Sequence, residues 1–269
     1  MTAATLQQAA RAVLAAADPQ EKLALTAASA ARWRAGVLPL AHDDAPVPEE
    51  PGRPLRPRLV QPRDVARRRL GTAEGRAALV HAVAHIEFNA INLAWDAVAR
   101  FAGMPRGYYD DWVSCAADEA RHFALLSARL AELGHAYGDL DAHDGLWLAA
   151  RETAHDCLAR MALVPRVLEA RGLDVTPGMI ERLRAVGDDT TAAILVLILR
   201  EEVAHVAAGT RWFEHLCRAR GLEPRATFVA LLAERGRSAL RAPFNHEARR
   251  AAGFDDGELA ALDRLASQR

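Results

Sequence analysis

The sequence has little of what marks secreted, membrane-spanning or nucleic-acid-binding proteins. Its three cysteines are far apart and form no Cys-x-x-Cys pair, which argues against a disulfide framework and a thiolate zinc site. The N-terminus lacks the basic and apolar regions of a signal peptide, and the longest purely apolar run, residues 192–199, is too short to cross a bilayer. The 34 basic and 35 acidic residues leave a formal charge of -1, so no broad charge signal favours nucleic acid or a membrane surface. We therefore expect a cytoplasmic protein without a membrane partner.

Lysine and aromatic residues are scarce as well, whereas alanine is abundant. Lys22 is the single lysine, and aromatic side chains make up 6% of the chain. Alanine occurs 59 times and is the strongest helix former. No segment shows the alternation of apolar and polar residues that is typical of a strand. The composition predicts an all-α protein.

Helical spacing of apolar residues and the positions of Gly and Pro divide the chain into segments. The first 34 residues predict a helical hairpin, and seven of the 13 prolines then predict an extended arm between Pro39 and Pro62. Gly134, Gly172 and Gly221 are read as helix stops. We expect long helices at residues 72–103, 107–133, 145–171 and 188–220, and a shorter one at 177–186.

Several glutamates lie in predicted helical segments that are otherwise apolar. Glu87 is the only carboxylate between Arg76 and Asp96 in an otherwise apolar helix, and Glu202 closely follows the apolar run 192–199. An unpaired buried carboxylate costs several kcal/mol unless it is protonated or has a cation beside it. A bound cation is therefore expected.

The spacing of these glutamates predicts a metal as that cation. Glu119 and His122 form a Glu-x-x-His pair, as do Glu202 and His205, and residues three apart share one face of a helix. Glu87 precedes Glu119 by 32 residues, and Glu169 precedes Glu202 by 33. Two half-sites of this kind are the ligand set of ferritin-like di-iron and di-manganese bundles. The predicted metal ligands are Glu87, Glu119, His122, Glu169, Glu202 and His205.

Other acids and histidines near these motifs are given lesser roles. Asp118 and Glu201 precede the two motif glutamates, and we expect Asp118 to orient His205 and Glu201 to orient His122. A third Glu-x-x-His, residues 152–155, lacks the repeat spacing and is read as a surface pair or an outer group.

Two further features bear on the same region. His81 and His85 are out of phase with Glu87 and are read as packing or hydrogen-bonded residues. Pro165 lies four residues before Glu169, where it either bends the helix beside the metals or separates two helices.

Segments around these residues also resemble a known family. HIEFNAINLAWD, YYDDWVSCAADEARHF, EEVAHVAAGTRWFEHLC and the tail segment RAPFNHEARRAAGF look like the ferritin-like bacterial family called domain of unknown function, number 455. The resemblance covers most of the chain and implies a ferritin-like fold with a dinuclear centre at the six ligands named above. A more distant likeness is to di-iron tRNA hydroxylases. At Glu201 the family pattern leads us to expect aspartate.

The resulting expectation is an all-α, ferritin-like four-helix bundle with additional N- and C-terminal helices. Residues 1–61 would form the hairpin and arm, 62–222 the di-metal bundle, and 223–269 a helical tail packing on it, whose segment 244–247 the sequence permits to close over the site.

The expected cofactor is two iron ions, with manganese as the alternative. We expect an oxidase or hydroxylase that uses O2 or peroxide on a small-molecule substrate, with room for an electron donor. Two alternatives stay open, a ferroxidase and a tRNA-modifying hydroxylase. The arginines Arg63, Arg67, Arg68 and Arg69 keep the second one open, although nucleic acid is not the expected partner. The sequence does not indicate the substrate or the oligomeric state.

Overall fold

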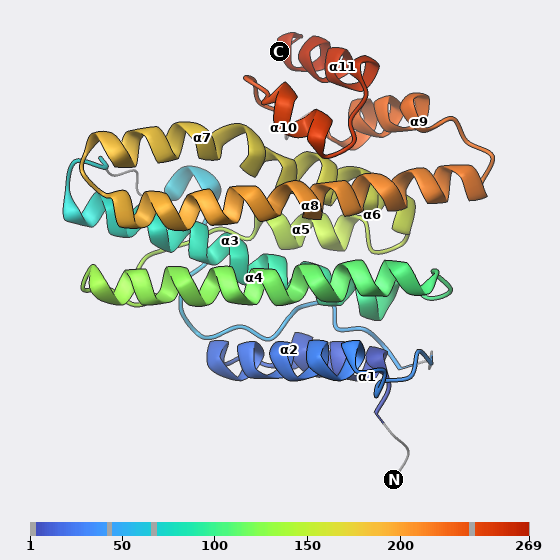
Figure 1. Cartoon of the computed structure of the whole chain (residues 1–269), viewed down its shortest axis with the longest axis horizontal. Coiled ribbons are helices and arrows are strands. Elements are labelled where there is room, and N and C mark those ends of the chain that lie inside the picture. Colours follow the sequence, from blue (N-terminus) through green and yellow to red (C-terminus); the bar gives the residue numbers. More distant parts are fainter. Residues whose placement is uncertain (1–3, 42–44, 66–68, 237–239, 269) are drawn as a thin grey trace. The chain divides into compact units, whose positions relative to one another are not determined.

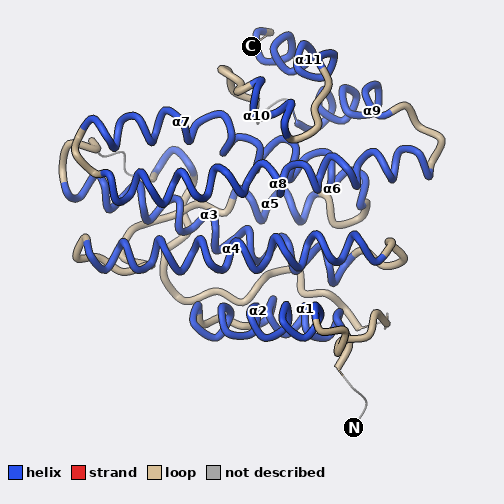
Figure 2. Tube along the Cα trace, in the orientation of Figure 1, coloured by secondary structure: helices blue, strands red, loops and turns tan. Residues whose placement is uncertain are grey.

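The computed structural model describes the chain except for residues 1–3, 42–44, 66–68, 237–239 and 269. Within the described residues the secondary structure is helical, as Figure 2 shows, and the only β element is an isolated bridge between Leu59 and Ala142. The predicted all-α class, a helical bundle, is therefore confirmed. The chain divides into two compact units, residues 1–148 and 149–269.

The first unit contains the N-terminal hairpin and two long helices (Figure 1). The helices α3 and α4 pack closely against each other, and the hairpin helices α1 and α2 pack on α3 and α4 respectively. The elements are α1 (Leu6–Ala15), α2 (Pro19–Arg34), the short 3-10 turn η1 (Pro62–Asp64), α3 (Ala73–Arg100), α4 (Arg106–Glu132) and the start of α5 (Gly145–Glu152). The two long helices lie within a few residues of their predicted limits.

Each long helix of this unit begins at a residue suited to that place. The side chain of Thr72 accepts a hydrogen bond from the amide of Gly75 and caps α3, and Pro105 precedes α4. Gly103 has a φ of 76° in the connection, which a residue with a Cβ adopts only with strain. The turn sends α4 back along α3, so that residues far apart in sequence share one interior.

The single lysine lies in this interior. Lys22 is fully buried, and its Nζ donates hydrogen bonds to the carbonyls of Val13 and Leu14 at the end of α1 and to Oδ1 of Asn92 on α3, at 2.8, 3.3 and 2.7 Å. Burial, together with the nearby charge of Arg53, lowers the pKa of Lys22 from 10.5 to about 7. Lys22 thus joins both hairpin helices to α3.

The proline-rich arm covers the same end of α1. The amide of Gly52 donates to the carbonyl of Leu14 at 2.7 Å, and a Cβ on Gly52 would overlap the carbonyl of Ala15. Trp147 donates through Nε1 to the carbonyl of Glu49 at 3.0 Å. The described residues of the arm, 39–41 and 45–62, therefore pack on the first unit without forming an α-helix.

The second unit is built on a helical hairpin, α7 packed against α8, with the tail helices beside it (Figure 1). Its elements after the end of α5 are α6 (Cys157–Leu163), the π-helical turn η2 (Val164–Glu169), α7 (Ala170–Ala185), α8 (Asp189–Ala219), α9 (Pro224–Leu231), the π-turn η3 (Leu232–Gly236), α10 (His246–Ala251) and α11 (Asp256–Ser267). The predicted helix 188–220 is confirmed as α8.

The predicted third helix, 145–171, is wrong in two respects. It is interrupted after Glu152, because Asp156 adopts an extended conformation and its side chain accepts from the amide of Leu158, which starts a new helix. It also does not stop at Gly172, since α7 continues through Gly172 and contains Pro177. Pro165 lies inside the π-turn of a continuous helical segment, so it does not separate two helices.

One helix of the described chain, α3, is long and apolar enough to cross a membrane by length and composition. In its most apolar window 72% of the residues are buried within the protein. Such burial is typical of the core helix of a soluble protein, so α3 gives only weak support for a membrane span.

The burial of Lys22 predicts a pH-dependent stability. The unfolded chain keeps the Lys22 proton up to its ordinary pKa of 10.5, whereas the folded chain releases it above about 7. Between these values the unfolded state binds more protons, so the free energy of unfolding rises with pH, by at most about 1.4 kcal/mol per pH unit. Urea denaturation of the wild type and Lys22→Met at several pH values from 7 to 10 measures this. The difference between the two proteins should change with pH, and a constant difference would contradict the account.

Candidate metal centre

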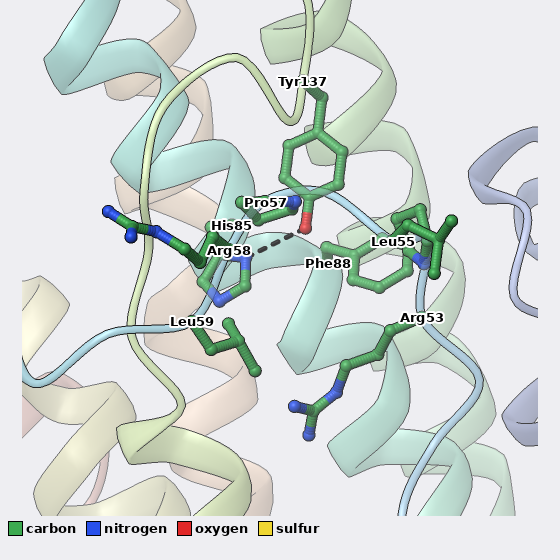
Figure 3. A pocket seen from close by; sticks show the side chains of 9 residues that line it. Arg53, Leu55, Pro57, Arg58, Leu59, His85, Phe88 and Tyr137 are labelled. Carbon is green, nitrogen blue, oxygen red and sulfur yellow. Dashed lines mark hydrogen bonds between the residues drawn. The ribbon is translucent and has the colours of Figure 1, made fainter.

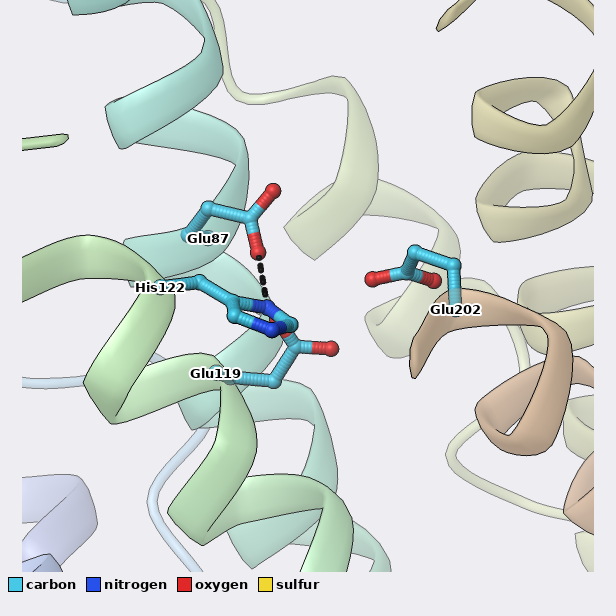
Figure 4. A group of neighbouring side chains, drawn as sticks. All are labelled: Glu87, Glu119, His122 and Glu202. Carbon is cyan, nitrogen blue, oxygen red and sulfur yellow. Dashed lines mark hydrogen bonds and ion pairs between the residues drawn. The ribbon is translucent and has the colours of Figure 1, made fainter. Parts of the chain in front are cut away.

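The middle of α3 and the middle of α4 bring three ligand-type side chains together. Glu87 on α3 and Glu119 and His122 on α4 are buried, with exposed fractions of 3%, 4% and 0%. His122 Nδ1 lies 3.1 Å from Glu87 Oε2 and 3.3 Å from Glu119 Oε2. Figure 4 shows the three groups converging from the two helices, and one ligand atom from each lies within 4.8 Å of the others. This buried glutamate–histidine cluster could hold a metal ion.

The electrostatics of the cluster favour a cation. Burial alone would lower the pKa of His122, but its hydrogen bonds with Glu119 and Glu87 outweigh burial and raise the pKa to about 11. Two carboxylates thus hold a positive charge in a place shielded from water. A divalent ion would be balanced by the same carboxylates, and a neutral His122 would offer it a nitrogen ligand.

The second unit holds a similar pair on α8. Glu202 and His205 are buried, and His205 Nδ1 lies 3.5 Å from Glu202 Oε1. The same imidazole nitrogen therefore faces the motif glutamate in both Glu-x-x-His pairs. Figure 4 also draws Glu202, which lies one helical turn before His205.

Glu169, the remaining predicted ligand, is the last residue of the π-turn η2 and is half-buried. The turn η2 packs against α8, the helix that carries Glu202 and His205. The union of all six ligands in one dinuclear centre stays a prediction.

The two acids predicted to orient the histidines are half-buried. Asp118 forms an ion pair with Arg121 at 2.7 Å, and Glu201 lies 3.6 Å from Arg200. Their predicted pairing with His205 and His122 stays a prediction.

Several histidines that the motifs single out lie outside the cluster. His81 and His85 are buried and hydrogen-bonded, as predicted: His81 Nε2 accepts from the amide of Gly138 at 3.0 Å. Glu152 and His155 are exposed, in agreement with a surface pair. Arg67 and Arg68, which kept a tRNA substrate open, lie outside the described residues.

A cavity on the first unit was not foreseen from the sequence (Figure 3). It has a volume of about 320 Å³ and lies between the arm, α3 and the loop after α4. Tyr137 reaches His85 Nδ1 at 2.9 Å, and burial lowers the pKa of His85 to about 4, so the neutral ring accepts from the tyrosine hydroxyl. The lining residues are Arg53, Pro54, Leu55, Pro57, Arg58, Leu59, His85, Phe88 and Tyr137. The prolines signalled an extended arm, but nothing in the sequence showed which surface it covers.

Two aromatic residues that directly follow Glu87 and His122 in sequence contact Tyr137 of the cavity lining. Phe88 follows Glu87, and Phe123 follows His122. The rings of Phe88 and Phe123 are 5.3 Å apart, and each contacts Tyr137, at 5.5 and 4.9 Å. The turns of α3 and α4 that carry the buried cluster therefore also carry Phe88 and Phe123.

The fold and site define a class, an all-α protein with a buried glutamate–histidine cluster of metal-binding type. The model of the family "Protein of unknown function (DUF455)" matches residues 15–260, and the chain belongs to this family. A protein of Haemophilus influenzae described as uncharacterized is 46% identical over 213 residues, which cover 77% of this chain and 74% of the relative. No solved structure matches the chain.

Competition between a proton and a metal at His122 predicts pH-dependent binding. Because the pKa of His122 is raised to about 11, a metal that binds Nδ1 displaces a proton at neutral pH. Apparent affinity for Mn²⁺ should then increase about tenfold per pH unit below that value. Titration calorimetry in buffers of different ionisation enthalpy measures the proton release.

The chain offers a matched control for this measurement. His122→Gln should lose the proton release, whereas His155→Gln, in an exposed Glu-x-x-His, should keep it. Equal release from both variants would show that His122 is not the displaced acid.

Proposed function

We propose that the protein is a non-haem dinuclear metal carboxylate protein, with iron as its metal and manganese as the alternative. The observation that carries this proposal is the convergence of Glu87, Glu119 and His122 in a buried cluster. The likeness of the Glu202–His205 pair, including the nitrogen that faces the carboxylate, supports a second half-site. Glu169 would complete that half in the way Glu87 completes the first.

The charges of the proposed ligand set support two divalent ions. Four carboxylates carry four negative charges and two neutral imidazoles carry none, so two divalent cations are balanced. The side chains would hold the ions, keep both histidines deprotonated at Nδ1 and exclude bulk water. A centre of this kind supplies the electrons that reduce O2 or peroxide.

We further propose that the reaction is the oxidation or hydroxylation of a small organic substrate. The cavity of about 320 Å³ supports an organic substrate, because its volume and its lining of Phe88, Tyr137 and aliphatic side chains suit a small molecule. A substrate that displaced Phe88 or Phe123 would also displace Glu87 or His122, the proposed ligands that directly precede them in sequence. Turnover with O2 would also need an electron donor as a partner.

Metal analysis of protein purified from iron-replete cells tests the dinuclear centre. The wild type should hold about two metals per chain, and Glu119→Ala and Glu202→Ala should each hold fewer, since each removes a proposed ligand. Glu152→Ala, in the exposed third motif, is the matched control and should keep the wild-type content. Less than one metal per wild-type chain, or no loss in the two variants, would end the proposal.

Oxygen consumption separates an oxygenase from an iron-handling protein. With about two equivalents of Fe²⁺ bound and a reductant present, we expect O2 uptake without growth of a ferric mineral. Oxidation of many further Fe²⁺ equivalents into a mineral core would contradict the proposed oxidase.

A further inference from the structure

The helix that carries Glu169 is irregular at two prolines. Pro165 has no N–H to donate to the carbonyl of Met161, and the segment around it forms the π-turn η2, in which the amide of Ala170 bonds to the carbonyl of Pro165. Pro177 likewise cannot donate to the carbonyl of Leu173. Each proline therefore leaves one carbonyl, that of Met161 or of Leu173, without its usual donor four residues later.

One short segment of the tail donates to carbonyls of this helix. Asn245 Nδ2 donates to the carbonyl of Leu173 at 3.1 Å, the carbonyl that Pro177 leaves open. Arg249 donates to the carbonyl of Arg166 inside the π-turn at 3.3 Å and to that of Ala170 at 3.4 Å. The bonded carbonyls lie just before and just after Glu169 in the chain. The tail thus donates to helix carbonyls on both sides of the proposed ligand, and the carbonyl of Leu173 is the one among them that a proline leaves open.

Arg249 itself is held in a fixed orientation. It is 1% exposed, and its guanidinium forms two hydrogen bonds with the carboxylate of Asp174 on α7, at 2.9 and 2.8 Å. A paired fork of this kind fixes both the position and the plane of the guanidinium. The amide of Asn245 also donates to Asp174, at 2.9 Å.

A second arginine anchors the π-turn itself to the tail. Arg166 is 1% exposed and donates through Nη2 to Glu258 of α11 at 2.7 Å. Its guanidinium lies 4.8, 4.0 and 4.5 Å from the centroids of three aromatic rings, of Phe213, Phe228 and Phe254. Two of these rings and the carboxylate belong to the region after α8. If Arg166 lost its contact with Glu258, its buried charge would have no counter-ion, which is strongly unfavourable.

The other side of the π-turn is fitted closely to α8. A Cβ on Gly209 would overlap the ring of Pro165, so the two helices approach closely only because residue 209 is glycine. Since α7 and α8 run antiparallel, four residues from this contact toward their connection reach Glu169 on one helix and His205 on the other. Glu169 therefore lies at the level of His205.

We infer that Arg249 and Glu258 are positioning residues, which hold the π-turn against α8 so that Glu169 is presented beside His205 as a metal ligand. This inference rests on the proposed function. Arg249 acts through the carbonyls of Arg166 and Ala170, and Glu258 acts through the guanidinium of Arg166. The C-terminal tail is then part of the second half-site, although it contributes no ligand.

Arg249→Met and its neighbour Arg250→Met form a matched pair for the test. Arg250 is exposed and pairs with the exposed Asp256, so its loss leaves the π-turn untouched. In Arg249→Met, amide hydrogen exchange of a peptide covering 164–172 should become faster on the order of tenfold, with α3 and α4 unchanged. Titration with Co²⁺, followed by its visible absorption, should fall from about two equivalents per chain to about one.

A second variant guards against misfolding of the first. Glu258→Gln keeps the shape of the side chain and an acceptor for the amide of Asp255 but removes the charge opposite Arg166. It should weaken the second Co²⁺ equivalent and spare the first. Faster exchange in Arg249→Met with both equivalents retained would overturn the positioning role, as would unchanged exchange. A wild type that binds no Co²⁺ would refute the proposed function, and the exchange difference would then describe the helix alone.

Discussion

Burial of Glu87 and Glu119 beside His122 is the interaction on which the first unit depends. Two carboxylates removed from water cost several kcal/mol unless a positive charge lies with them. In the chain that charge falls on the His122 imidazole, whose Nδ1 lies within 3.3 Å of both carboxylates. The cluster therefore suits a cation, either the proton on His122 or a metal ion.

Other parts of the first unit pack on the two helices that carry this cluster. The apolar middle of α3 is covered by the N-terminal hairpin, which Lys22 ties to Asn92, while Thr26 accepts from the indole of Trp95 at 3.1 Å. Gly52 brings the arm against the end of α1 and fixes where the arm begins its path past Phe88. A hairpin and an arm that look peripheral in sequence thus pack on the helices that carry Glu87, Glu119 and His122.

The second unit contains an irregular helix, which the tail supports through hydrogen bonds. Pro165 and Pro177 interrupt its hydrogen bonds on either side of Glu169, and Asn245 and Arg249 supply donors from the tail. Proline in a helix usually weakens it, but here Asn245 bonds to the carbonyl of Leu173, which Pro177 leaves open. The tail is therefore bonded to the carbonyls of the helix and to Asp174, in addition to its apolar packing.

The sequence predicted what depends on local periodicity. The all-α class and the limits of α3, α4 and α8 follow from apolar spacing and stop signals. The pairing of Glu119 with His122 follows from i,i+3 geometry, and Glu87 was added to them by the matched spacing of the two half-sites. The sequence did not predict the break of the helix at Asp156, because an aspartate that caps a helix has the same sequence pattern as one within a helix. Gly172 failed as a stop because Asn245, more than 70 residues later, supports the helix beyond it. The cavity depended on where an extended arm packs, which periodicity does not encode.

The position of metal ions in the folded chain tests the proposed dinuclear centre most directly. Anomalous diffraction at the iron edge, from crystals of protein loaded with Fe²⁺, would locate it directly. We predict two peaks about 3.5–4 Å apart, one bound by Glu87, Glu119 and His122 and the other by Glu169, Glu202 and His205. A single peak, or peaks away from these side chains, would contradict a dinuclear centre.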